Sequence, residues 1–136
     1  RFKLPDERLK REPSLQEDIT ELKNDLKIKD EDLLEMQTNS TRDYIKHVKN
    51  INNEEDYLAH IYVRYLGDLR GGQMISKKIP GKGKYYQFEN NRELANSIYQ
   101  VINDNMADEA KKVFDFATKL FIEMYKSDQK RKPFIL

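Results

Sequence analysis

The sequence predicts an all-α protein, and three observations lead to that fold class. Apolar residues recur at three- and four-residue spacings along most of the chain, whereas the alternation typical of strands is almost absent. The four prolines, Pro5, Pro13, Pro80 and Pro133, fall at the edges of these periodic segments, where helices tolerate them. Charged residues make up 36% of the 136 residues and hydrophobic residues 38%, as expected for helices with one solvated face.

The first segments begin near the N-terminus. Pro5 is expected to lead into a short helix or turn over residues 4–12. Ser14 and Glu17 have the spacing of a capping box, which predicts that a helix begins there. The apolar stripe of this helix is formed by Leu15, Ile19, Leu22 and Leu26. The charged stretch at 27–32 weakens the helical pattern.

The next helix is predicted from the same kind of signal. Ser40 and Asp43 are expected to begin it, and the polar loop at 50–56 ends it. Its apolar side is formed by Tyr44, Ile45 and Val48.

The longest helical pattern runs over residues 54–79 and stops at Pro80. Asn90 or Asn91 is then expected to cap a further helix. The apolar positions of that helix are Leu94, Ile98, Val101 and Ile102.

The last helix is predicted over residues 106–126. The side chains expected to face inward are Val113, Phe114, Ala117, Leu120, Phe121 and Met124. Residues 127–136 form a basic and then apolar tail, which we expect to be flexible. The length and the single run of helices predict one domain over residues 1–136.

Three glycines interrupt the longest helical pattern, at Gly67, Gly71 and Gly72. Each costs a helix interior about 1 kcal/mol relative to alanine, so their presence needs a reason. They could let another helix pack closely, or they could present bare backbone to a large flat ligand. Spacing alone leaves both interpretations open.

Asp68 stands among these glycines and is the carboxylate that the sequence singles out. A buried carboxylate needs hydrogen-bond partners. Arg64 lies four residues earlier, on the same helical face, and is the expected partner.

Composition excludes several other kinds of chemistry. The absence of cysteine excludes disulfides, thiolate metal sites and thiol catalysis. His47 and His60 lie on different predicted helices without metal-ligand spacing, so we expect structural roles for them and no metal site. A net charge of +1 gives no general attraction to nucleic acid. No apolar run approaches the roughly 20 residues that a membrane span needs.

Residues 57–79 resemble the distal-helix signature of heme oxygenases. The matching residues are His60, Tyr62, Arg64, Tyr65, Leu66, Gly67, Asp68, Leu69, Gly71, Gly72 and Gln73. Weaker similarity covers most of the chain. It begins partway into the family's domain, so we expect a heme-oxygenase-like helical bundle that lacks the N-terminal proximal helix in this chain.

The resemblance implies a heme held between two helices and oxidised with O2 to biliverdin, iron and carbon monoxide. It assigns heme contacts to Gly67, Gly71, Gly72, Tyr62 and Phe114. Asp68 would organise the water on the distal side, with Arg64 beside it. An active member would also need a reductase or ferredoxin as its partner.

Four departures from the family pattern argue against that activity. The family's axial histidine matches neither His47 nor His60. Asn96 and Gln100 stand where the family has cations for the heme propionates, and Arg70 fills a position that is usually small. In addition, some members have an asparagine of the distal hydrogen-bond network at the position of Ala117.

The sequence therefore predicts a divergent heme-oxygenase-like protein without heme-degrading activity, retained for interaction or scaffolding with an unidentified protein partner. No cofactor is then expected. The alternative is an active heme oxygenase, with heme as its ligand and an axial histidine upstream of Arg1. The lysine- and asparagine-rich composition and the divergence point to a plastid type of the family, as in apicomplexans. Because the sequence begins at Arg1, we expect any targeting signal to lie upstream.

Overall fold

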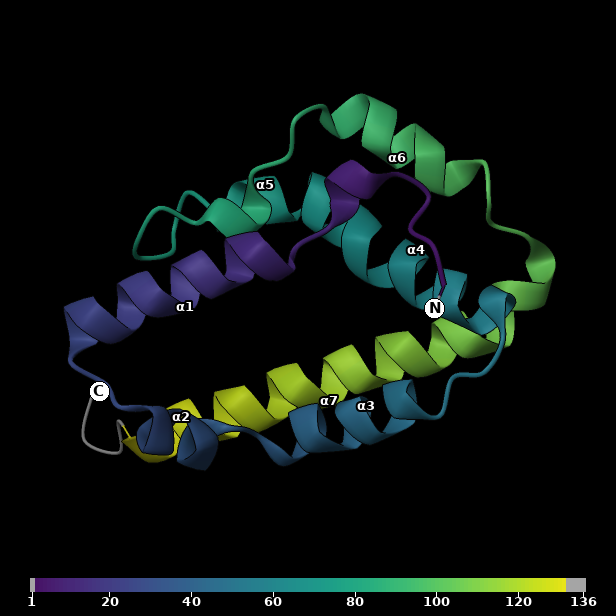
Figure 1. The fold of residues 1–136 in the computed structure, drawn as a ribbon. Helices are drawn as coiled ribbons and strands as arrows, with labels where there is room; N and C mark the ends of the chain where they lie inside the picture. The colour runs from purple at the N-terminus through teal and green to yellow at the C-terminus, as the bar shows by residue number, and fades with distance from the viewer. Residues whose placement is uncertain (1, 132–136) are drawn as a thin grey trace.

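The computed structural model describes residues 2–131, and all the regular elements in that range are helices, which confirms the all-α class (Figure 1). Its α-helices are α1 (Glu12–Leu26), α2 (Asp30–Met36), α3 (Asn39–Lys49), α4 (Glu54–Arg70), α5 (Gly72–Ile75), α6 (Asn91–Tyr99) and α7 (Ala107–Arg131). In the described residues there are also three 3-10 helices: η1 (Glu7–Leu9) precedes α1, η2 (Lys84–Tyr86) lies between α5 and α6, and η3 (Asp104–Met106) lies between α6 and α7. The described residues contain no strand.

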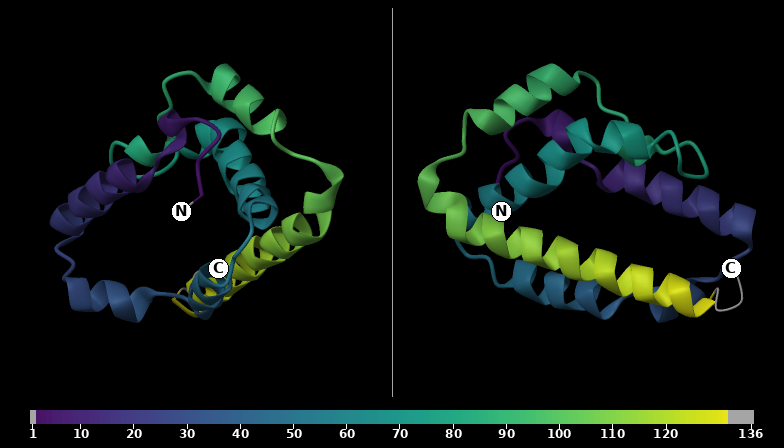
Figure 2. Two further views of the ribbon diagram at one scale, coloured as in Figure 1. Left: turned by 45° about the vertical axis from the view of Figure 1, so that its right-hand side comes forward. Right: turned by 180° about the vertical axis from the view of Figure 1, so that it is seen from behind.

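The helices form an open frame. α3 runs beside α7, and α4 crosses the first half of α7 and then diverges from it (Figures 1 and 2). α6 packs across the outer side of α4, while α1 and α2 form the remaining side of the frame. In the described residues, no helix is both long and apolar enough to span a membrane.

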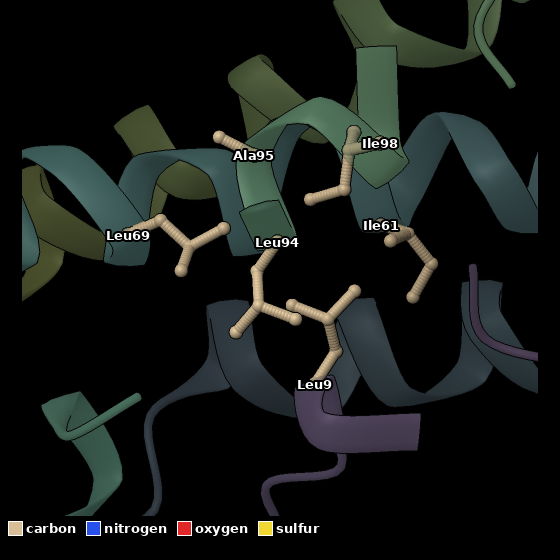
Figure 3. Close-up of a cluster of buried hydrophobic side chains, with 6 residues drawn as sticks. All are labelled: Leu9, Ile61, Leu69, Leu94, Ala95 and Ile98. Carbon is tan, nitrogen blue, oxygen red and sulfur yellow. The ribbon is translucent and has the colours of Figure 1, made fainter. Parts of the chain in front are cut away.

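Two apolar clusters hold the crossing of α4 with its neighbours. Figure 3 shows the larger one, in which η1 packs against α4 and α6. Its buried members are Leu9, Ile61, Leu69, Leu94, Ala95 and Ile98. The smaller cluster joins α4 to η3 and α7 through Leu58, Ala59, Met106 and Ala110. No residue of α1, α2 or α3 is buried, so the core lies entirely at the α4 end of the frame.

Two of the predicted helix starts are wrong. α1 begins at Glu12 with Pro13 in its first turn, so Ser14 already lies inside the helix and cannot cap it. α3 is capped by Thr38, whose side chain accepts from the backbone N–H of Thr41. Ser40 therefore lies inside the first turn of α3.

Other boundaries agree with the sequence or extend it. Asn90 caps α6 by accepting from the backbone of Glu93, as predicted. α1 ends at Leu26 and is followed by Lys27, which has the left-handed φ of 55°. The charged stretch then continues as the unpredicted helix α2. The long pattern at 54–79 divides at Gly71 into α4 and α5.

The prediction that the apolar residues of α7 face inward holds for Val113 and fails for Phe114, Phe121 and Met124. These three are 56%, 68% and 53% exposed. The reason is that the described residues contact the second half of α7 mainly from the α3 side (Figure 2). α7 also continues to Arg131, beyond the predicted end; the rest of the expected tail, 132–136, lies outside the described residues.

Candidate functional site

The three glycines of the signature fall into two physical classes. A Cβ added at Gly67 would meet nothing within 4 Å, and one at Gly71 would meet only the Gly67 carbonyl oxygen, at 3.5 Å. A Cβ at Gly72 would lie 2.7 Å from Cδ1 of Tyr86, which is far inside van der Waals contact. Gly72 is therefore required for packing, whereas Gly67 and Gly71 leave backbone open to solvent.

Helix geometry places the open glycines on one stripe of α4. His60, Arg64, Gly67 and Gly71 are spaced four, three and four residues apart, which keeps them on one face. At His60 this face is buried against Glu109 of α7. Further along, α4 has diverged from α7, so the same face is open at the glycines (Figure 1).

Asp68 has a specific partner that the sequence did not suggest. The hydroxyl of Tyr85 donates to Oδ2 of Asp68 at 2.7 Å. Burial raises the pKa of Asp68, and the Tyr85 hydrogen bond together with the charges of Arg64 and Arg11 offsets only part of this rise. Burial and the Asp68 carboxylate also raise the pKa of Tyr85.

The segment that carries Tyr85 is fixed from two sides. Asp18 of α1 accepts from the backbone N–H groups of Lys84 and Tyr85, at 2.9 and 2.8 Å. The side chain of Gln73 donates to the carbonyl of Tyr86 at 2.8 Å. Asp68 is thus held by a hydrogen-bonded loop, and its carboxylate is engaged with protein.

Arg64 does not pair with Asp68 as predicted. Within the described residues, no ion pair joins the two side chains, and the Arg64 guanidinium lies 4.5 Å from the ring centre of Tyr44 on α3. The cause is that α3 reaches the Arg64 side of α4, where an aromatic face is available.

The remaining predicted site residues do not converge on the glycines. Tyr62 is half-buried and packs against both apolar clusters, about 140° around α4 from Gly67. Phe114 lies exposed on α7. Arg70 is exposed at the end of α4, and its guanidinium lies 5.5 Å from the ring centre of Tyr99.

Both histidines join one buried cluster that the sequence did not predict. Nε2 of His47 on α3 and Nε2 of His60 on α4 lie 2.6 and 2.7 Å from the same oxygen of Glu109 on α7. His60 and Glu109 are each only 6% exposed. The Tyr44 hydroxyl lies 2.7 Å from the other ring nitrogen of His60.

Burial sets the charge states in this cluster. It lowers the pKa of His60 below the ordinary value, outweighing the hydrogen bond with Glu109, so the ring is neutral at pH 7. Burial also acts to raise the pKa of Glu109, but the hydrogen bonds from both histidines outweigh it and lower that pKa below its usual range. Glu109 is therefore an ionised acceptor for the two Nε2–H groups.

Comparison with known proteins identifies the family. The family model described as heme oxygenase matches residues 2–123. The chain belongs to the heme oxygenase family. Among curated relatives, heme oxygenase 2 of Macaca fascicularis is 29% identical over 108 residues, covering 62% of this chain and 34% of that protein. The heme oxygenase of Guillardia theta is 52% identical over 40 residues, covering 28% of this chain and 17% of that protein.

The chain spans about a third of the length of the mammalian heme oxygenases that it matches. The heme oxygenase of Porphyra purpurea is 39% identical over 62 residues, which cover 38% of this chain and 26% of that protein. No solved structure matches the chain closely enough to count as a relative.

The face of α4 that carries the open glycines Gly67 and Gly71, called the glycine face below, meets only part of what a bound heme needs. The open backbone at Gly67 and Gly71 leaves room for one. Nε2 of His47 and Nε2 of His60 both contact Glu109 on the α7 side of α4, and Nδ1 of His60 contacts Tyr44. In this arrangement neither ring reaches the open glycines. The described residues therefore offer an open backbone surface at Gly67 and Gly71, with neither imidazole beside it.

Proposed function

We propose that this heme oxygenase family chain does not degrade heme and that its fold serves as an interaction or scaffolding element. One observation carries the proposal: Glu109 holds both histidines of the sequence, on the α7 side of α4. A heme iron without a strong axial donor has no firm anchor.

Electrostatics at the expected propionate positions supports the same proposal. Asn96 on α6 and Gln100 at its end are exposed amides in this chain. Substituting amides for cations removes charge-assisted hydrogen bonds of roughly 1.5–3 kcal/mol each. The exposed aromatic side chains of α7, Phe114, Phe121 and Tyr125, offer an apolar surface for a protein partner.

Hemin titration tests the proposal. The protein is titrated with hemin and the Soret band is recorded, with the Gly67→Leu variant as matched control. Leucine at this open position would occupy the space beside α4 without meeting protein atoms at its Cβ. We expect the same broad, non-saturating spectrum from both proteins. A sharp one-equivalent band in the wild type that is lost in G67L would overturn the proposal.

A second candidate function is favoured by the open glycine face itself. Gly67 and Gly71 keep bare backbone on one stripe, which an unused helix has no reason to retain at about 1 kcal/mol per glycine. In this alternative the chain is part of an active heme oxygenase, and an axial histidine outside this sequence completes the site. Heme would then supply the iron that activates O2, while Asp68 would orient water at its free lone pairs. The hemin titration distinguishes the two candidates.

A further inference from the structure

The buried cluster of His47, His60 and Glu109 lies on the α7 side of α4, away from the open glycines Gly67 and Gly71. In the proposed function its only part is to keep both histidines away from those glycines. Its three ligating atoms, two imidazole nitrogens and one carboxylate oxygen, all lie within 4.8 Å of one another. They come from α3, α4 and α7, the three helices that meet at this end of the frame. We propose that the cluster is a binding site for a divalent transition-metal ion, with zinc as the best match.

The set of donor atoms selects the ion. Two neutral imidazoles and one carboxylate suit Zn2+ and its first-row neighbours, whereas Mg2+ and Ca2+ prefer sites made only of oxygen. Zinc binds nitrogen and oxygen donors at about 2.0–2.2 Å, which places tetrahedral ligand atoms roughly 3.3 Å apart. The two nitrogens now lie 2.6 and 2.7 Å from the oxygen. An ion therefore needs the carboxylate to retract by about 0.6 Å, which side-chain rotation can supply.

The charge of the cluster favours a cation. The Glu109 carboxylate is buried beside the two imidazole rings, and a buried carboxylate favours a positively charged partner. The Nζ of Lys112 lies 3.8 Å from the second oxygen of Glu109, but the Lys112 side chain is 61% exposed, so solvent screens its charge. A divalent ion at the shared oxygen would supply the missing positive charge.

The surroundings of the cluster also resemble those of metal sites. Histidine ligands usually hold a hydrogen-bond partner on the ring nitrogen that does not face the metal. Nδ1 of His60 has such a partner in the Tyr44 hydroxyl, at 2.7 Å. On binding, His60 carries its proton on Nδ1, and Tyr44 changes from donor to acceptor. The ring of Phe116 packs against both Tyr44 and His47, with centroid distances of 5.3 and 5.1 Å.

Access is available from one side. A pocket of about 250 Å³ opens at His47 and is lined also by Lys112, Asp115, Phe116 and Lys119. It gives an ion a route to His47, at the edge of the cluster, and leaves room for water as a fourth ligand. With an ion bound, the site would join α3, α4 and α7. No residue of α3 is buried, so the ion would strengthen the contact between α3 and α7.

The proposal is tested by titrating the chelator-treated full chain with ZnCl2. Calorimetry measures the binding, and the urea midpoint measures the change in stability. We expect one equivalent to bind and the midpoint to rise with zinc. His47→Gln should weaken binding at least 100-fold and abolish the shift, and Tyr44→Phe should weaken binding about 10- to 100-fold because it removes the partner of a ligand. Asp115→Asn, at the rim of the pocket, should bind like the wild type.

Cobalt provides a readout that does not depend on the stability of a variant. The wild-type chain with one equivalent of Co2+ should show the visible absorption of a tetrahedral site with nitrogen ligands. The proposal is overturned if the wild type binds neither ion, or if it binds them at several weak sites that H47Q leaves unchanged. In either case the cluster is a hydrogen-bonded network alone.

Discussion

Alanine at Gly72 should destabilise the protein, whereas alanine at Gly67 should stabilise it. At Gly72 the new Cβ would lie 2.7 and 3.0 Å from two ring carbons of Tyr86, so the ring must move by about 1 Å to reach normal contact. Movement is opposed because Gln73 holds the backbone of Tyr86 and the ring of Tyr85 packs edge-on against it at 5.1 Å. Overpacking of this kind costs about 1–3 kcal/mol, against a helix-propensity gain of at most about 1 kcal/mol.

The expected free energy of unfolding is thus lower by up to about 2 kcal/mol for Gly72→Ala. Gly67→Ala meets no atom within 4 Å and should raise it by about 0.5–1 kcal/mol. Urea unfolding followed by circular dichroism measures both. In a Tyr86→Ala background, Gly72→Ala should lose its cost because the clash is gone. The reasoning is refuted if the two glycine variants have equal stability, or if the cost at Gly72 persists without the Tyr86 ring.

Three further predictions concern the carboxylates. Burial raises the pKa of Asp68, so the folded state binds the Asp68 proton more tightly and loses stability as pH rises from about 4 through that raised pKa. The urea midpoint of Asp68→Asn should therefore rise relative to that of the wild type between pH 4 and pH 7. A constant difference between the two midpoints would contradict this. Tyr85→Phe removes the hydrogen-bond donor to the Asp68 carboxylate, so the free energy of unfolding at pH 7 should fall by about 1.5–3 kcal/mol in equilibrium unfolding. An unchanged free energy of unfolding would contradict this. Glu123 accepts hydrogen bonds from Ser40 and Asn39 at the start of α3, which lowers the pKa of Glu123. The stability that these bonds contribute is present above the ordinary carboxyl pKa range and is lost as pH falls through the lowered pKa. Glu123→Gln should therefore lower the thermal midpoint at pH 7 and converge with the wild type in acid, whereas equal midpoints at pH 7 would exclude this cap.

Local signals in the sequence predicted the helical class and one of the helix caps. The period of the apolar residues and the Asn90 cap depend on neighbouring residues only, and both agree with the structure. The cap predicted at Ser14 failed because Pro13 is also a favourable first-turn residue and moves the start of α1 to Glu12. Competing local signals of this kind have similar energies, so neighbouring contacts decide between them.

The buried histidine cluster could not be predicted in the same way. His60 and Glu109 are 49 residues apart, and nothing local marks Glu109 among the many acidic residues of the chain. The partner of Asp68 was missed for a related reason, because Tyr85 reaches it through a loop held by Asp18 of α1. The histidine of the signature offered the one available signal, since a polar residue on the buried face of α4 requires a partner.

A heme turnover assay measures whether this chain degrades heme. The protein is mixed with one equivalent of hemin, a reductase and NADPH under air, and biliverdin is followed by its visible absorption. Among the residues that the structure describes, Glu109 holds both His47 and His60, and neither imidazole faces Gly67 and Gly71. We therefore expect no biliverdin above the level given by hemin and reductase alone. Stoichiometric biliverdin that disappears in the Gly67→Leu variant would contradict it.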